Sequence, residues 1–156
     1  MVRRGGVILS QKCQYALRAV FELMRSPGVG PIKIGRIAAA QAIPIPFLQT
    51  ILNQLKQAGI IVETVRGKDG GYRLARDGRK LTVGEVILSI QGPIVLVDCH
   101  ASSIANQCPF AKDCVFWPLW EKARHALLDV LNATTFDDLV KLDEGRKSGK
   151  ILTYSI

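Results

Sequence analysis

The chain lacks the features that mark several large classes of protein. Its 156 residues contain no apolar run of the length that a membrane-spanning helix needs, which is about 18 or more residues. The segment "MVRRGGVILSQKCQ" does not have the apolar stretch and cleavage site of a signal peptide. No P-loop, HExxH motif, nucleophile elbow or supported pair of carboxylates occurs. We therefore expect a cytoplasmic protein that is not an enzyme and does not enter the membrane.

Cysteine is scarce, yet three of the four cysteines fall in one segment, at Cys99, Cys108 and Cys114. A reducing cytoplasm disfavours disulfides, so clustered thiols there indicate metal binding or redox chemistry. The surrounding residues are polar, which argues against a core segment. Structural zinc sites favour cysteines two to four residues apart, and these three are spaced more widely. A metal centre, either an iron-sulfur cluster or zinc, and a thiol-disulfide switch remain open, and the spacing makes a zinc site the less favoured metal centre.

Acidic residues are missing from the stretch between Ile34 and Val62, and charge is unevenly distributed over the whole chain. Residues 1–80 contain 14 Lys and Arg against 4 Asp and Glu, whereas residues 81–156 contain 7 and 9. A basic half of this kind attracts the phosphates of a nucleic acid. We expect a DNA-binding domain over residues 1–80 and a region with another role over residues 81–156.

The apolar spacing in the basic half predicts three short helices and a β-hairpin. The first helix covers about 11–25 after a Ser10 cap, and the second begins near Ile34. The third lies in "IPIPFLQTILNQLKQAGI", with Pro46 in its first turn. A Gly-rich hairpin follows over about 60–75. This order is that of a winged helix-turn-helix, so the predicted fold is mainly α with one small β-hairpin.

In a winged helix-turn-helix the third helix enters the major groove, where polar side chains reach the base edges. The hairpin then acts as a wing beside the groove. The predicted DNA-binding residues, taken from the second and third helices and the wing, are Arg36, Pro46, Gln49, Thr50, Asn53, Gln54, Lys56, Arg66 and Lys68.

The carboxyl-terminal half contains a capping box and the longest helical pattern of the chain. Thr82 and Glu85 have the spacing of that box, so a helix should begin there. A second pattern runs from Pro118 to about Ala133 and carries an apolar stripe that a small neighbouring domain cannot cover fully. We expect this helix to pair with a second subunit, which gives a homodimer.

The chain resembles the Rrf2 family of bacterial winged-helix transcription regulators, which includes the iron-sulfur regulator IscR, the nitric-oxide sensor NsrR and the iron regulator RirA. The motifs that carry this resemblance are "LSQKCQYALRA", "LTVGEVI", "CPFAKDCVFWPLWEKA" and, as the most specific, the wing "VRGKDGGYRL". The resemblance covers about residues 9–141. It implies a homodimer on a partly palindromic double-stranded DNA operator, with the long helix at the dimer contact.

In the cluster-binding members of this family, three loop cysteines bind iron, and Cys99, Cys108 and Cys114 fall at those positions. The resemblance therefore implies an iron-sulfur cluster as cofactor, with 2Fe-2S preferred over 4Fe-4S. Relatives supply a fourth ligand as a histidine where this chain has Trp117, or as an acidic residue where it has Gln14. Cys13, the neighbour of Gln14, is the candidate fourth ligand here, and a packed core cysteine is the alternative for the same residue.

Overall fold

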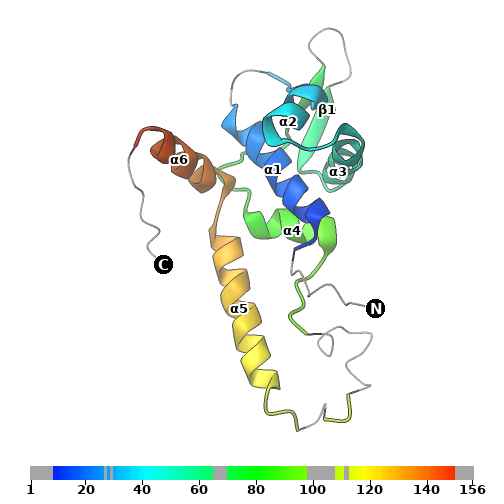
Figure 1. Ribbon diagram of the computed structural model, residues 1–156, viewed down its shortest axis with the longest axis vertical. Helices are drawn as coiled ribbons and strands as arrows, with labels where there is room; N and C mark the ends of the chain where they lie inside the picture. The colour runs from blue at the N-terminus through cyan, green and yellow to red at the C-terminus, as the bar shows by residue number, and fades with distance from the viewer. Residues whose placement is uncertain are drawn as a thin grey trace.

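The computed structural model of the chain describes residues 9–26, 28, 30–64, 70–97, 108–110 and 113–149. These residues form helices and one antiparallel hairpin (Figure 1). The expectation of a mainly α fold with a small β-hairpin is confirmed. In chain order the elements are α1 (Gln11–Arg25), α2 (Ile34–Gln41), α3 (Ile45–Gln57), β1 (Ile61–Thr64), β2 (Gly71–Leu74), α4 (Val83–Gln91), α5 (Trp117–Ala133) and α6 (Phe136–Lys147).

Helix α1 lies at the centre of the molecule, where it packs against α2, α3, α4 and α6 (Figure 1). Its first turn is capped by Ser10, whose hydroxyl oxygen accepts a hydrogen bond from the Cys13 amide at 3.1 Å. Small and branched side chains on its buried face, among them Ala16, Ala19 and Val20, allow the neighbouring helices to approach closely.

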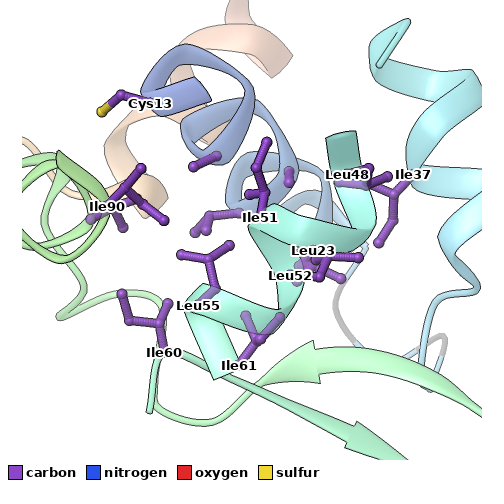
Figure 2. Packing of buried hydrophobic residues seen from close by; sticks show 14 of the residues in the cluster. Cys13, Leu23, Ile37, Leu48, Ile51, Leu52, Leu55, Ile60, Ile61 and Ile90 are labelled. Carbon is purple, nitrogen blue, oxygen red and sulfur yellow. The ribbon is translucent and has the colours of Figure 1, made fainter. Parts of the chain in front are cut away.

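Helices α2 and α3 form the helix-turn-helix. The turn between them contains Ala42 in the left-handed conformation, with φ of 50°, and its amide closes the end of α2. Helix α3 turns its apolar side chains toward α1, and these are Leu48, Ile51, Leu52 and Leu55 (Figure 2). Because this face is buried, the rotation of α3 about its axis is fixed and its opposite face stays exposed.

The hairpin β1–β2 pairs Ile61 with Leu74 at one end and Thr64 with Gly71 at the other. A third segment joins this sheet, since Ile32 and Tyr72 exchange two backbone hydrogen bonds of 2.8 Å. The strands lie so close here that a Cβ on Gly71 would be 2.6 Å from the Ile32 carbonyl oxygen. Glycine at position 71 is therefore a steric requirement of the sheet.

Helix α4 completes the core instead of starting a separate one. The predicted capping box is confirmed: the Thr82 hydroxyl accepts from the Glu85 amide, and the Glu85 carboxylate accepts from the Thr82 amide. Val86 and Ile87 are buried in the same cluster as the α1 and α3 side chains. The core thus continues across the boundary at residue 80 that separates the two expected regions.

Helix α5 projects from this core, with its first turn farthest away and its last turn next to the core, where α6 follows (Figure 1). Phe136 at the start of α6 is fully buried, and α6 packs on α1. By contrast, α5 has no buried residue within the described chain, although Leu127, Leu128 and Leu131 pack on the edge of the core. The helix expected from Pro118 begins one residue earlier, at Trp117.

Candidate functional site

The exposed face of α3 contains most of the side chains predicted to contact DNA. Pro46, Gln49, Thr50, Asn53 and Lys56 are all exposed. The Thr50 hydroxyl donates a hydrogen bond to the Pro46 carbonyl oxygen at 3.3 Å, one turn earlier in the same helix. The structure thus groups these five positions on the side of α3 that is turned away from the core.

Gln54 lies elsewhere than expected. Its side chain is half-buried, and its amide nitrogen donates hydrogen bonds to the carbonyl oxygens of Ser89 at 3.1 Å and Ile90 at 3.0 Å. These carbonyls end α4, where helix backbone acceptors lack partners of their own. In this structure Gln54 connects the recognition helix to α4 and does not share the exposed face.

A chain of polar side chains joins α3 to the base of the wing. The Gln49 amide donates to the Tyr72 hydroxyl at 3.3 Å, and this hydroxyl donates to Glu63 at 3.1 Å. Lys56 pairs with the other oxygen of the Glu63 carboxylate at 2.7 Å. The hydrogen bonds from Lys56 and Tyr72 lower the pKa of Glu63, and the Glu63 carboxylate in turn raises the pKa of Lys56. Gln49 and Lys56 are thereby held beside the wing.

The electrostatic character of this surface is basic. Arg36 is exposed on α2, and no acidic residue occurs in α2 or α3. Glu63 of β1 is the nearest carboxylate along the chain, and it is already paired with Lys56. The wing residues Arg66 and Lys68 lie outside the described residues.

A buried polar network, which the sequence did not reveal, connects α1 to the end of α2. Glu22 of α1 is 2% exposed and accepts a hydrogen bond of 2.8 Å from Gln41, the last residue of α2. Arg25 donates to the same carboxylate at 3.2 Å, so the buried charge has a partner. The only signal in the sequence was an acidic residue beside the apolar face of the first helix.

The cysteine loop is described in part. Cys108 and Cys114 are free thiols and half-buried, while Cys99 lies outside the described residues. The Cys114 carbonyl oxygen accepts from the Trp117 amide at 3.2 Å, so Cys114 stands at the beginning of α5. Among the described residues, no three side chains of His, Cys, Asp or Glu are close enough together to hold a metal ion. The donor chemistry of the two thiols fits a soft metal centre.

Cys13 does not resemble a ligand in this structure. It is fully buried in the hydrophobic core, and Figure 2 shows it projecting from α1 on the side where Ile90 of α4 also lies. Burial raises the pKa of the Cys13 thiol, whereas a metal ligand needs the thiolate. These observations favour the core alternative for Cys13.

None of the helices in the described residues combines the length and the apolar character that a membrane span requires.

Comparisons with known proteins agree with this architecture. The family model named Rrf2, iron-dependent transcriptional regulator, matches residues 9–142. The HTH-type transcriptional regulator CymR of Bacillus subtilis is 30% identical over 139 residues, which are 89% of this chain and 94% of the relative. Its solved structure, that of a global cysteine regulator, has a TM-score of 0.69 at 28% identity and covers 90% of this chain and 98% of that one. The structure of T. potens IscR has a TM-score of 0.71 at 28% identity and covers 96% of each chain.

Proposed function

Because the chain belongs to the Rrf2 family of DNA-binding transcription regulators, we propose that an iron-sulfur cluster controls its binding to a partly palindromic operator. Residues 1–80 bind the DNA, and residues 81–156 hold the cluster and the dimer contact. Members of this family are transcription regulators and not enzymes, and the same holds for this protein. The observation that carries the DNA-binding part is the exposed, acid-free face of α3, which hydrogen bonds and an ion pair connect to the β1–β2 hairpin.

DNA binding follows from this surface. Two copies of α3 in a dimer enter successive major grooves, where Gln49 and Asn53 offer amides to base edges and Thr50 offers a methyl group. Arg36, Lys56 and the wing residues Arg66 and Lys68 contact phosphates. Gln54 supports α3 from behind through α4.

The dimer contact rests on α5. Leu119 and Val130 of this helix are 52% and 55% exposed, and none of its residues is buried by the described part of the chain. Exposed apolar side chains on a helix that projects from the core are unfavourable in water, and a second copy of the same helix would bury them. Because Cys114 stands at the beginning of α5, the ligand loop adjoins the proposed dimer contact.

The proposed cluster is held by Cys99, Cys108 and Cys114, with 2Fe-2S favoured over 4Fe-4S. When bound, it supplies a redox- and iron-sensitive connection among three thiolates. Two connections would link the cluster to the rest of the protein. Cys114 stands at the start of α5, so the cluster would influence where that helix begins. In the other direction, the cysteine segment follows α4, to which Gln54 of α3 is hydrogen-bonded. Operator binding then changes as the population of DNA-competent dimers changes.

The experiment is anaerobic purification with iron, sulfide and zinc assays and a visible absorption spectrum. We expect a coloured protein with iron and sulfide, and loss of both in Cys108→Ala and in Cys114→Ala. For the DNA-binding part, Arg66→Ala should reduce the salt dependence of binding by about one counterion, whereas Gln49→Ala should relax preference at particular bases. Unchanged binding by both variants would contradict the proposed DNA-contacting surface.

A second candidate is a regulator that responds through its thiols or through zinc, without an iron-sulfur cluster. Its support is the 30% identity to CymR, whose structure is described as that of a global cysteine regulator. Colourless protein with zinc, or colourless protein whose DNA affinity changes on reversible oxidation of Cys108 or Cys114, would favour it over the cluster.

A further inference from the structure

The amino-terminal tip of α3 is apolar and exposed, which the proposed function does not yet explain. Pro44, Ile45, Pro46 and Phe47 are all exposed, and the side chains of Ile45 and Phe47 are 51% and 62% exposed. We call these four residues the apolar tip. Four consecutive exposed apolar residues are unusual on a surface in contact with water, and such a run is expected mainly where it has a function.

The location of the apolar tip separates it from the other exposed apolar side chains. Within the described residues, those others are Leu88, Val95 and a group between Phe110 and Val130, on α4, α5 and the loop beside them. Ile45 and Phe47 are the only large exposed apolar side chains in the described part of residues 1–80. They therefore lie on the DNA-binding half and not on the proposed dimer helix.

The backbone holds the apolar tip in one orientation. Pro44 and Pro46 restrict the entry to α3, and Leu48 is fully buried directly after Phe47. The turn before it is closed by a hydrogen bond of 3.0 Å from the Ile43 amide to the Ala38 carbonyl oxygen. Ile45 and Phe47 consequently point outward on a rigid support, one on each side of Pro46.

The polar neighbours of the apolar tip identify its occupant. The next turn of α3 presents Thr50, three residues after Phe47 and so adjacent to it on the helix surface. In a helix-turn-helix the first turns of the recognition helix approach the base edges most closely. The major groove offers one apolar group on those edges, which is the 5-methyl group of thymine.

We propose that Phe47 and Ile45 are specificity-determining residues that contact thymine 5-methyl groups in the major groove. This inference rests on the proposed function, because it requires α3 to enter that groove. The contact removes a methyl group and part of an apolar side chain from water, and it distinguishes thymine from cytosine and from uracil. One such methyl contact changes affinity about fourfold.

The test separates this inference from DNA binding as such. Wild-type protein first selects duplexes from a random-sequence library, and the best duplex is then synthesised with deoxyuridine in place of each thymidine in turn. We expect a loss of about threefold to tenfold in wild-type affinity at one or two positions per half-site, and no loss at thymidines outside the site. Phe47→Ala should bind the unmodified duplex more weakly and should lose the sensitivity to deoxyuridine at one of these positions.

Phe47→Leu is the matched variant, since it retains an apolar side chain and should retain part of that sensitivity. The exposed position predicts unchanged midpoints of urea unfolding for both variants. A deoxyuridine scan without any loss, or equal losses in wild type and Phe47→Ala, would overturn the inference while leaving DNA binding intact. The inference would also be overturned if Phe47→Ala kept wild-type DNA binding but lost the binding of a protein partner that the wild type captures. Failure to select any duplex would instead overturn the proposed function, and this inference with it.

Discussion

The side-chain nitrogen of Gln54 donates a hydrogen bond of 3.0 Å to the carbonyl oxygen of Ile90. The same nitrogen also binds the Ser89 carbonyl oxygen, so one amide group satisfies two acceptors at the end of α4. This end of α4 is tied to α1 too, because the Ser10 amide donates to the Gln91 side chain at 3.0 Å. The recognition helix and the segment that leads toward the cysteine loop therefore meet at the last turn of α4.

Replacing Gln54 with alanine should lower the free energy of unfolding by about 1–2 kcal/mol, because two helix-end carbonyls lose their donor. Glutamate at this position should be worse, since a carboxylate would face the two carbonyl oxygens at the negative end of a helix. Urea unfolding of Gln54→Ala and Gln54→Glu measures the order. Operator affinity should fall by a similar factor for all sequences, as expected of a positioning residue.

Gln57→Ala is the control for stability, because Gln57 is an exposed glutamine at the end of the same helix. It should unfold like the wild type. If Gln54→Ala instead alters preference at one base pair and leaves stability unchanged, Gln54 contacts DNA directly and its bond to α4 is incidental.

Gly71→Ala should destabilise the wing by about 1–3 kcal/mol, because the new Cβ would meet backbone that has little freedom to move. The clash is with Ile32, whose carbonyl oxygen would lie at 2.6 Å. Gly35→Ala provides the comparison, since that position in α2 has open space around it and should gain about 0.5–1 kcal/mol from helix propensity. Thermal unfolding of the two variants should shift in opposite directions, and equal shifts would contradict the close approach at Gly71.

Acidification should destabilise the protein through its capping boxes. The pKa of Glu85 lies below its ordinary value of 4.5, first because the Thr82 amide donates to its carboxylate and also because Arg76 is near. Because the pKa of Glu85 is lower in the folded protein than in the unfolded chain, its carboxylate stabilises the fold fully at pH values above the unfolded pKa. This stabilisation is lost as the pH falls through the folded pKa. The free energy of unfolding should therefore decrease between about pH 5 and pH 3.

Glu85→Gln should flatten this decrease, because the amide cannot be protonated in that range. Asp138→Asn is the matched variant at α6, where Thr135 is the N-cap residue and the Asp138 carboxylate accepts hydrogen bonds from it, which also lower the pKa of this carboxyl. Urea unfolding at several pH values follows both. Profiles that coincide with the wild type in both variants would show that other carboxylates govern the acid transition.

The order of elements was predictable because local signals agree with the packing. Apolar residues recur at helical spacing in α1 and α3, and Ser10 and Thr82 cap their helices. In the sequence, a Gly-rich segment separates the two β-strand patterns of the wing. Each signal lies within a few residues of the feature that it predicts. The exposed face of α3 followed for the same reason, since its buried face was visible in the apolar pattern.

The role of Gln54 was not predictable because it depends on a contact across 35 residues of sequence. In the sequence, Asn53 and Gln54 are equivalent polar residues on one helix, and only the packing of α3 against α4 decides which of them meets solvent. The sequence also could not distinguish a ligand from a core residue at Cys13, because a cysteine near the start of a helix can either bind a metal or pack as a small buried side chain. The core contacts of Cys13 favour packing.

Cys13→Ala should therefore retain the iron and sulfide of the wild-type protein, while Cys108→Ala loses them. The physical reason is that the Cys13 thiol is buried with a raised pKa, so that forming a thiolate ligand there would require opening the core. Removing its sulfur should lower the free energy of unfolding by about 1 kcal/mol through lost packing, and Cys13→Ser should cost more because it places a hydroxyl in an apolar site. Iron and sulfide assays, visible spectra and urea unfolding of the three variants under anaerobic conditions provide the measurement. A folded Cys13→Ala protein without iron would assign Cys13 as the fourth ligand and would mean that α1 rearranges when the cluster binds.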